Sequence, residues 1–416
     1  MTPLKLALVT RRYPPLIGGA EKVLSYLAFA LAAEGAEVTI LTSNVAGLDL
    51  PVTEVHAIGL SPNTSLRALH SSGRLTVVRL STSPLRFWGT WCYMRALQQW
   101  FRSNYVDLAY VSMLKHDAYS VIGTGKRLHF PVVLRPEGAG ATGDIAWQSH
   151  DNFGRLIGER CRQATAFVAI STPIKHELQA AWHSGTMRPL WLRRGVKQTL
   201  AEPRIETISN GVPIPEIPWQ RRANWHSAPR AIFVGRLARE KGLDILLNAW
   251  PAVRAVYTNA RLILLGEGPL RPTLEAHARK LNMTVGPGES IELRGATADP
   301  TAMVREADLF ILPSREEGMS VALLEAMALG IPLVASSIPG NQQLIEDFKH
   351  GRLAPPEDPA ALSRTIIDQW RDFDTASYMG RAARNRVNQT FSIQKMAQEH
   401  LALFEKILNY SRRAQA

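Results

Sequence analysis

The C-terminal half of this 416-residue sequence alternates short apolar runs with helical stretches. A short, unbroken apolar run is typical of a strand that is buried on both faces, as in a parallel sheet. Regular alternation with helices indicates right-handed crossovers that place such strands side by side. The predicted elements are strands at 231–234, 261–265, 290–294, 308–312, 332–335 and 351–354 and a helix at 358–372.

The N-terminal half shows the same alternation less regularly. Its predicted strands lie at 6–9, 38–41, 108–111, 132–134 and 166–170. A chain of 416 residues is longer than one ordinary domain, so two domains are expected. The predicted fold class is α/β, with two Rossmann-like domains that each contain a doubly wound parallel sheet.

A proline-rich stretch, Pro213-Ile-Pro-Glu-Ile-Pro218, marks the boundary between the two domains. Proline cannot continue a helix or join a central strand, so this stretch predicts a linker. We expect an N-terminal domain at 1–212, the linker at 213–229 and a C-terminal domain at 230–390. An amphipathic helix at about 391–411 ends the chain without forming a domain of its own.

The composition is that of a globular protein, because 46% of the residues are hydrophobic and 20% are charged. The first apolar run is too short for a signal peptide, and no apolar stretch approaches the roughly 20 residues that span a bilayer. The two cysteines, Cys92 and Cys161, have no metal-ligand spacing. We therefore expect a soluble, cytoplasmic protein without structural zinc or a disulfide framework.

The formal net charge of +12 lies almost entirely in the N-terminal half. Residues 1–200 contain 22 Lys or Arg against 12 Asp or Glu, and the rest contains 26 against 24. Two stretches there, 86–91 and 188–197, mix aromatic and cationic residues. Such mixtures suit an anionic membrane surface, with buried aromatics edged by solvated charges as the alternative. Nucleic acid is not an expected partner, because no recognition helix or RNA-binding signature accompanies the charge.

Two cations follow the first predicted strand of the C-terminal domain. The apolar run 231–234 stops at Gly235, and Arg236 and Lys241 come before the next helix. In a doubly wound sheet, ligands bind beyond the carboxyl ends of the strands. Both cations are therefore expected where a ligand binds, and their charge suits a diphosphate.

Two glutamates lie in the stretch 315–330, Glu317 in a predicted loop and Glu325 in the helix that follows. Ser320 is the expected N-cap, and Gly330 marks the exit of the helix. The helical neighbours of Glu325 are apolar, so its carboxylate is expected to be buried. A buried carboxylate is either neutralised or directed at a polar ligand, and we favour the ligand.

Together, Gly235-Arg236-x4-Lys241-Gly and Glu317-Gly-x6-Glu325 resemble the donor-site motifs of retaining GT-B glycosyltransferases, specifically glycosyltransferase family 4. Four further segments resemble that family in the same order along the chain: 18–21, 208–212, 337–341 and 351–356. The resemblance implies two Rossmann-like domains facing a central cleft, with the acceptor bound by the first and a nucleotide sugar by the second. It also implies a last helix that crosses back to the first domain.

The resemblance assigns a role to each donor-site position. Arg236 and Lys241 would stabilise the departing diphosphate, Glu317 would hold the hydroxyls of the donor sugar, and Glu325 would accept from the ribose. These first three are the expected catalytic residues. The remaining donor-binding positions are Gly18, Gly19, Gly235, Gly295, Gly318, Met319 and Ser320, of which 318–320 would present backbone N–H groups.

The acceptor side departs from the family pattern, because Glu137 stands where family members often have a histidine. His116 is a candidate substitute, with a structural role as the alternative. Asp144 could bind an acceptor hydroxyl or cap a helix. Asn210, in the segment that leads to the second domain, completes the expected acceptor-side set.

The resulting hypothesis is a metal-independent, retaining enzyme that moves a hexose from a nucleotide diphosphate sugar, UDP- or GDP-linked, to a hydroxyl acceptor. The resemblance implies a front-face mechanism without a cofactor, in which the leaving phosphate helps to deprotonate the acceptor. The expected localisation is the cytoplasm, with peripheral attachment to the inner face of the cell membrane. The alternatives are a non-catalytic sugar-nucleotide sensor or scaffold, and an epimerase of the same fold.

Overall fold

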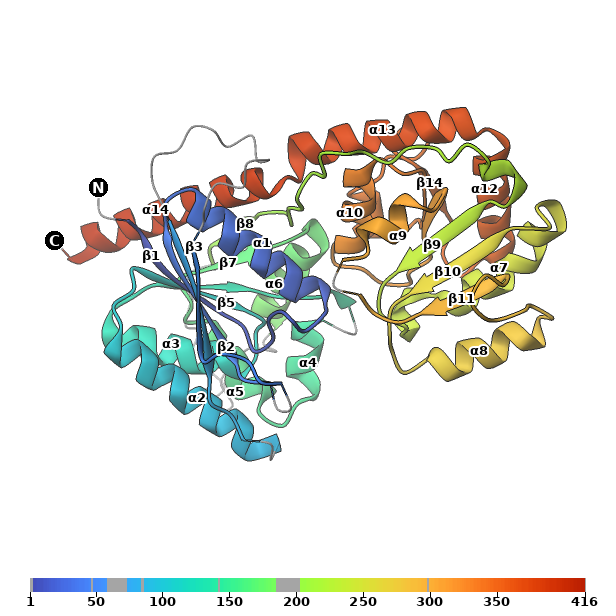
Figure 1. Ribbon diagram of the computed structural model, residues 1–416. Helices are drawn as coiled ribbons and strands as arrows, with labels where there is room; N and C mark the ends of the chain where they lie inside the picture. The colour runs from blue at the N-terminus through green and yellow to red at the C-terminus, as the bar shows by residue number, and fades with distance from the viewer. Residues whose placement is uncertain are drawn as a thin grey trace. The chain divides into compact units, whose positions relative to one another are not determined.

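The chain forms two compact units, seen in a computed structural model that describes residues 3–45, 48–57, 73–83, 86–140, 143–184, 203–297 and 299–415 (Figure 1). The first unit comprises Met1–Leu16, Ala20–Asn210 and Ile393–Ala416, and the second comprises Ile17–Gly19 and Gly211–Ser392. The chain therefore passes from the first unit to the second at residue 210 and returns at residue 393.

The first unit is built on an eight-stranded sheet with the strand order β3-β4-β2-β1-β5-β6-β7-β8. All pairs are parallel except β3 with β4. The strands are β1 (Lys5–Val9), β2 (Glu37–Ser43), β3 (Thr53–Ala57), β4 (Arg74–Leu80), β5 (Leu108–Ser112), β6 (Val132–Arg135), β7 (Ala166–Ala169) and β8 (Ile205–Thr207).

The five strands predicted in this half are confirmed as β1, β2, β5, β6 and β7. Three were missed: β3, β4 and β8. The sequences of β3 and β8, TEVHA and IET, contain no apolar run, and β4 alternates buried with more exposed residues. These strands lie at or next to the edges of the sheet, where one face or one side is less buried, so an apolar run is not required.

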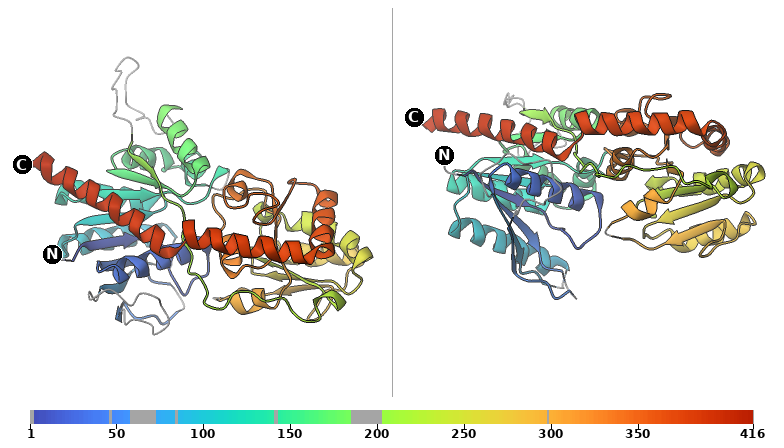
Figure 2. Two further views of the ribbon diagram at one scale, coloured as in Figure 1. Left: turned by 90° about the horizontal axis from the view of Figure 1, so that it is seen from above. Right: turned by 45° about the horizontal axis from the view of Figure 1, so that its top comes forward.

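Helices cover both faces of the first sheet. They are α1 (Gly19–Ala33), α2 (Arg86–Ser103), α3 (His116–Leu128), α4 (Asp144–His150), α5 (Gly154–Cys161), α6 (Thr172–Ser184) and α14 (Ile393–Gln415). The helices α2, α3 and α5 pack side by side. On β5, Tyr110 faces the opposite way, towards His400 and Phe404 of α14, which runs along the first unit (Figure 2).

The last helix is part of the core of the first unit. Met396, Leu403, Phe404 and Ile407 of α14 are buried. The Tyr110 hydroxyl lies 3.0 Å from Nε2 of His400, and Nδ1 of His400 lies 2.8 Å from the Met396 carbonyl oxygen. Burial lowers the pKa of His400 to about 4, so the ring is neutral at neutral pH. A neutral ring can donate to the Met396 carbonyl through one nitrogen and accept from Tyr110 through the other.

The second unit is built on a six-stranded, all-parallel sheet with the order β11-β10-β9-β12-β13-β14. The strands are β9 (Arg230–Val234), β10 (Arg261–Leu265), β11 (Ile291–Arg294), β12 (Leu309–Leu312), β13 (Leu333–Ser336) and β14 (Arg352–Ala354). Each of the six predicted strands is confirmed, with boundaries that differ by at most one residue. Regular alternation of short apolar strands with helices made this half easy to predict.

The helices of the second unit also lie in two groups, with α7, α8 and α12 in one and α9, α10 and α13 in the other. They are α7 (Leu243–Val256), α8 (Arg271–Lys280), α9 (Thr301–Arg305), α10 (Val321–Leu329), α11 (Pro339–Gln342), α12 (Pro359–Arg371) and α13 (Phe373–Thr390), with the short 3₁₀ turns η2 (Trp225–Ser227) and η3 (Arg239–Lys241). The buried rings of Trp250 and Trp370 pack edge to face between α7 and α12. The sheet is therefore doubly wound, as predicted.

The stretch 213–229, which the sequence predicts to be a linker, packs on the second unit. The backbone N–H of Trp219 donates to the Leu329 carbonyl, and its indole N–H donates to the Ala307 carbonyl, each at 2.7 Å. Arg222 forms an ion pair with the fully buried Asp308. This stretch is therefore held in place without regular secondary structure beyond η2.

Candidate functional site

The strand order of the second unit reverses between β9 and β12. At such a reversal the loops that follow the two strands diverge to opposite faces and leave a crevice in which ligands of doubly wound sheets bind. Residues 235–242 follow β9, and residues 313–320 follow β12. The donor-site positions that the sequence singled out in these two segments therefore leave neighbouring strands at the same end of the sheet.

The two segments meet in an ion pair between Lys241 and Glu317. Nζ of Lys241 lies 2.6 Å from Oε1 of Glu317, and the Ser314 hydroxyl donates to the same oxygen at 2.7 Å. The Lys241 side chain is 19% exposed and that of Glu317 is 8% exposed. Two predicted donor-site residues that are distant in sequence are thus in direct contact, with the lysine still accessible to solvent.

Two glycines allow the backbones of these segments to approach closely. Gly242 has φ +62°, and a Cβ at this position would lie 2.1 Å from the Pro313 carbonyl oxygen. A Cβ on Gly340 would lie 2.3 Å from the Glu317 carbonyl oxygen. Real Cβ atoms do not come this close to backbone, so both positions require glycine. The position of Glu317 is therefore set by backbone packing on two sides.

Arg236, the other predicted cation, forms an ion pair with Glu240 four residues later. Its side chain is 64% exposed. Burial tends to raise the pKa of Glu240, but the hydrogen bond and charge of Arg236, with the charge of Lys241, lower it overall. Glu240 is therefore ionised at neutral pH, and both cations of this segment face a carboxylate.

A third cation, Arg315, was not assigned a role from the sequence. Its guanidinium donates to both carboxylate oxygens of Asp244, at 2.8 and 2.7 Å, and to the carbonyl of Arg239 at 2.8 Å. It also pairs with Glu357. Arg315 thus joins the segment after β12 to the turn that carries Lys241. The 71-residue separation from Asp244 gave no signal in the sequence.

The helix α10 begins as predicted, because the Ser320 hydroxyl accepts from the Leu323 N–H at 3.3 Å and Gly330 ends the helix with φ +84°. Gly318, Met319 and Ser320, which precede it, are buried. The predicted burial of Glu325 is wrong, since Glu325 is only half-buried. It lies on the same side of α10 as Val321 and Ala322, the other two half-buried residues of this helix.

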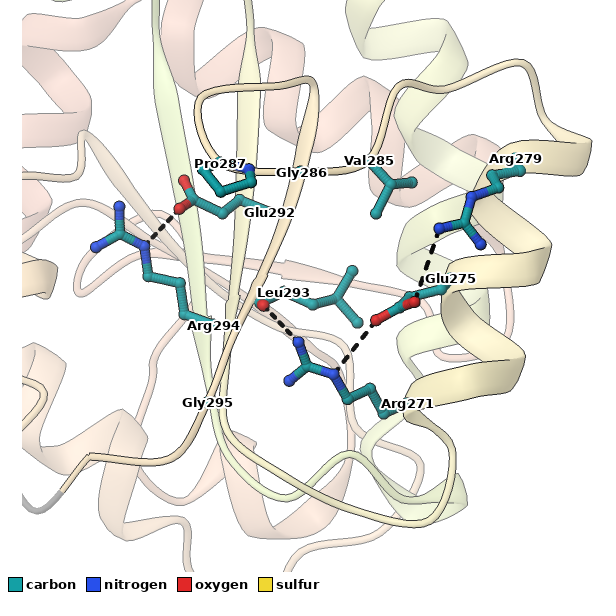
Figure 3. Close-up of a pocket in the computed structure, with 10 residues that line it drawn as sticks. All are labelled: Arg271, Glu275, Arg279, Val285, Gly286, Pro287, Glu292, Leu293, Arg294 and Gly295. Atoms are coloured by element: carbon teal, nitrogen blue, oxygen red, sulfur yellow. Dashed lines mark hydrogen bonds and ion pairs between the residues drawn. The ribbon is translucent and has the colours of Figure 1, made fainter.

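Gly295 lies at one end of a pocket of about 610 Å³ beside the edge strand β11 (Figure 3). Three side chains of α8 point towards that strand, and Arg271 donates to the Leu293 carbonyl at 2.9 Å. Arg294 pairs with Glu292. The lining residues are Arg271, Glu275, Arg279, Val285, Gly286, Pro287, Glu292, Leu293, Arg294 and Gly295.

Gly235 ends β9, and its N–H donates to the Leu265 carbonyl at 3.0 Å. Gly18 ends the loop after β1, and Gly19 begins α1. In that loop Arg12 pairs with the buried Glu21 of the first turn of α1, Nε to Oε1 2.8 Å. The sequence did not indicate this pair.

In the first unit, the expected acceptor-side residues gather around Arg135, at the carboxyl end of β6. This arginine is buried. One guanidinium nitrogen pairs with Glu137, and the other donates to the Asn210 side-chain oxygen at 2.7 Å. The Ser112 hydroxyl donates to Glu137 at 2.9 Å. Arg135 and Ser112 were not singled out, although an arginine that ends an otherwise apolar strand is a usable signal.

Asp144 holds two loops of the first unit together. One carboxylate oxygen accepts from the Leu114 N–H at 3.0 Å and from the Glu137 N–H at 2.9 Å. Asp144 is itself the first residue of α4, whose N-cap is Gly143 without a side-chain cap, so its carboxylate does not cap that helix. Met113, between Ser112 and Leu114, has φ +76°, a strained conformation that these bonds help to maintain.

His116 begins α3 and is apart from this hydrogen-bond network. Its ring packs edge to face on Trp147 of α4, with centroids 5.7 Å apart. Burial, opposed in part by the charge of Asp151, lowers the pKa of His116. The structure thus brings Glu137, Asp144 and Asn210 together and leaves His116 beside them on the neighbouring helix.

No helix in the described ranges is both long and apolar enough to cross a bilayer. Within those same ranges, no three His, Cys, Asp or Glu side chains are grouped as metal ligands. The stretch 188–197, which the sequence offered as a membrane-facing segment, lies outside the described residues.

Comparison with known proteins gives matches to both halves of the chain. Residues 17–188 match the family model Glycosyltransferase Family 4, and residues 228–372 match Glycosyl transferases group 1. The glycogen synthase of Mycobacterium tuberculosis is 26% identical over 95% of this chain and 92% of its own. A GDP-mannose-dependent alpha-(1-6)-phosphatidylinositol monomannoside mannosyltransferase of Mycobacterium tuberculosis is 29% identical over 40% of this chain and 45% of its own.

Among solved structures, Anabaena Alr3699/HepE in complex with UDP-glucose superimposes with a TM-score of 0.70. It is 16% identical and covers 97% of this chain and 100% of its own. Two doubly wound Rossmann-like units with such structural neighbours define the GT-B fold. With both halves matched by its models, the chain belongs to glycosyltransferase family 4, and it is a transferase enzyme.

Proposed function

We propose that this enzyme transfers a hexosyl group, with retention of anomeric configuration, from a nucleotide diphosphate sugar to a hydroxyl acceptor. The observation that carries the proposal is the contact of Lys241 with Glu317, beside Arg236, at the strand-order reversal of the second unit. The complex of Alr3699/HepE with UDP-glucose and the GDP-mannose dependence of the curated relative support a nucleotide sugar as donor.

The chemistry requires positive charge where the diphosphate departs. Breaking the bond between the anomeric carbon and the phosphate oxygen leaves negative charge on that oxygen, and fixed cations stabilise it. Lys241 faces Glu317, and Arg236 faces Glu240. Arrival of the diphosphate exchanges a carboxylate for a phosphate at each cation. The exchange leaves Glu317 able to accept hydrogen bonds from the sugar hydroxyls.

The remaining donor contacts follow from the same placement. Glu325, which is half-buried on α10, accepts from the two ribose hydroxyls, since its two oxygens match a vicinal diol. The N-terminal end of α10, at 318–320, presents backbone N–H groups to the sugar and phosphate. Arg294 and Gly295, at the pocket beside β11, border the nucleotide base.

The acceptor is bound by the first unit, around Glu137 and Asn210. In the transfer, the acceptor oxygen bonds to the anomeric carbon on the face from which the phosphate oxygen leaves, and its proton passes to that phosphate. Arg236 and Lys241 supply the charge that a metal ion provides in other transferases, so the proposed reaction is metal-independent. The proposal extends to a peripheral position of the enzyme on an anionic membrane surface, where a lipid-linked acceptor would be presented.

Hydrolysis of the donor tests the proposal without knowledge of the acceptor. UDP- and GDP-linked hexoses are incubated with the protein, and release of the nucleotide diphosphate is followed. Lys241→Ala and Arg236→Ala should each lower the rate about 10²-fold or more, which corresponds to roughly 3 kcal/mol of transition-state stabilisation.

Arg239→Ala is the matched control, because Arg239 is an exposed cation in the turn between them. It should keep the wild-type rate. Near-wild-type release by both test variants would contradict the proposed role of the cations. Tight nucleotide-sugar binding by the wild type without any release would favour a sensor instead.

A further inference from the structure

One side of α2 in the first unit exposes an aromatic and cationic stripe. Trp88 is 54% exposed and Trp91 is 46% exposed, and Arg95 and Arg102 are exposed further along the helix. The intervals of three, four and seven residues place all four on one side of the helix. We call these four residues the tryptophan–arginine stripe. At 1.5 Å per residue it runs for about 21 Å.

The opposite side of α2 is fixed in the core of the first unit. Tyr93, Leu97 and Phe101 are buried, at the four-residue spacing of a helix face. The Tyr93 hydroxyl donates to the Thr10 carbonyl at 3.2 Å, and the Phe101 ring stacks on Phe130. The stripe therefore cannot turn inward, and its exposure is a property of the folded unit.

The stripe residues contact one another. The rings of Trp88 and Trp91 pack edge to face with centroids 5.6 Å apart, and the Arg95 guanidinium lies 5.3 Å from the centre of the Trp91 ring. The stripe thus combines a partly ordered aromatic surface with charge. Tryptophan and arginine in this combination are typical of segments at the headgroup level of a bilayer.

The neighbouring helix adds positive charge. α3 packs along α2, as Figure 1 shows, and its last turn exposes Lys126, Arg127 and Leu128. The stacking of Phe101 on Phe130 places this turn near the Arg102 end of the stripe. The sequence of α2 itself contains three arginines and no aspartate or glutamate. This surface is therefore cationic over two helices.

We propose that the tryptophan–arginine stripe docks the first unit on a bilayer that contains anionic lipid. The cations attract the headgroups, and the two tryptophans enter the interface between headgroups and acyl chains. A second copy of the chain fits less well, because a two-fold interface over this surface would bring the cations of both copies into one contact area. This inference assigns the membrane contact of the proposed function to α2. It rests on the proposed function only for the reason why the enzyme would bind a membrane, and the binding itself can be measured independently.

Vesicle flotation of the full-length protein tests the inference. Neutral phosphatidylcholine vesicles are compared with vesicles that also contain phosphatidylglycerol, at low salt and at about 0.5 M salt, where the Debye length falls to a few ångströms. The wild type should float with the anionic vesicles at low salt and be released at high salt. Equal retention by neutral and anionic vesicles, or by neither, would overturn the inference.

Two double variants locate the contact. Trp88→Ala with Trp91→Ala, and Arg95→Ala with Arg102→Ala, should each weaken vesicle binding, the arginine pair by about 30-fold, since each cation near an anionic surface contributes about one kcal/mol. The matched control is Tyr378→Ala with Arg371→Ala, an exposed aromatic and an exposed cation of the second unit, which should bind as the wild type does. Unchanged binding by both stripe variants would overturn the proposed location.

Nucleotide binding and thermal unfolding of each variant distinguish the possible failures. A stripe variant that keeps its melting temperature and its stabilisation by UDP or GDP has kept its fold and its nucleotide site. Weaker vesicle binding by such a variant is then due to the altered stripe alone. Vesicle binding without any nucleotide binding would remove the proposed function and leave this inference standing. Self-association that depends on Trp88 and Trp91, without vesicle binding, would assign the stripe to a second copy and overturn the inference.

Discussion

Each unit contains a glutamate that is bonded by a cation and by a serine hydroxyl at the carboxyl ends of parallel strands. In the second unit these are Glu317, Lys241 and Ser314, and in the first they are Glu137, Arg135 and Ser112. The pair in the second unit joins segments 76 residues apart, and its lysine remains 19% exposed. The pair in the first unit lies within one segment, and its arginine side chain is 3% exposed.

This difference separates two uses of the same groups. Lys241 is reached by solvent, so in the proposed function it can release the carboxylate and pair with a phosphate. The buried guanidinium of Arg135 already forms an ion pair with Glu137 and a hydrogen bond to Asn210. Burial raises the pKa of Glu137, and the charge of Arg135 with the Ser112 hydrogen bond limits that rise. We infer that Arg135 keeps its partners and holds Glu137 and Asn210 in position, whereas Lys241 can exchange its partner for a ligand.

The largest expected effect comes from removing the buried cation. Arg135→Met leaves the carboxylate of Glu137 without its partner, which should lower the free energy of unfolding by about 3–5 kcal/mol. Lys241→Met should lower it by much less, since solvent reaches Lys241 and can take its place beside Glu317. Among the described residues, no second side chain depends on Lys241 as Asn210 depends on Arg135. Urea denaturation of both variants measures the difference. Equal losses would break the comparison between the two pairs.

The pH dependence of stability should also differ between the units. In the first unit, burial raises the pKa of Asp117 to about 6, against the opposing charges of Arg11 and Lys115. The stability that a raised carboxyl pKa contributes is present below its ordinary pKa near 3.8 and is lost as pH rises through about 6. Asp117→Asn should therefore stabilise the protein at pH 7, by up to about 3 kcal/mol, and flatten the dependence between pH 4 and 6.

Asp244 of the second unit should behave in the opposite sense, because the hydrogen bond from Arg315 lowers its pKa. Its contribution is present above the ordinary pKa and is lost as pH falls through the lowered value. Urea denaturation of Asp117→Asn and Asp244→Asn from about pH 2 to pH 8 compares them, since the change at Asp244 lies below its ordinary pKa of 3.8. A wild-type pH profile in Asp117→Asn would show that this carboxyl is not the origin of the dependence.

The smallest expected effect distinguishes the two proposed donor-site glutamates, Glu317 and Glu325. Glu325→Gln should weaken binding of the free nucleotide diphosphate by roughly 1–3 kcal/mol, the usual cost of a lost charged hydrogen bond. Glu317→Gln should leave that affinity almost unchanged while turnover falls, because its proposed partner is the sugar. Titration calorimetry with UDP and GDP decides between them. Loss of nucleotide affinity in Glu317→Gln but not in Glu325→Gln would reverse the assignment.

The sequence predicted the second unit in more detail than the first, for physical reasons. Strands with a buried interior, such as β9 and β12, require apolar runs, whereas β3 and β8 contain charged residues and lie at the two edges of the first sheet. Motif spacing placed Lys241 and Glu317 in one site. Their direct contact could not be predicted from the spacing, because it depends on the pairing of β9 with β12 in the sheet.

Other features of the site could not be obtained from the sequence. Arg315 reaches Asp244 across 71 residues, and no local pattern indicates such a pair. The carboxylate of Asp144 binds two backbone N–H groups, a role that depends on the strained turn at Met113. Glu325 is half-buried and not fully buried, because burial of a helical residue depends on which neighbours cover the helix as well as on the residues of the helix.

The placement of α14 has a consequence for how the protein is made. Residues 393–415 supply Phe404 and Ile407 to the core of the first unit, and His400 bonds to Tyr110 on its central strand β5. During synthesis on the ribosome, the core of the first unit can be completed only after α14 has been translated. All residues of the second unit have been translated before that point. The unit whose first residues are translated first is thus the unit whose last core residues are translated last.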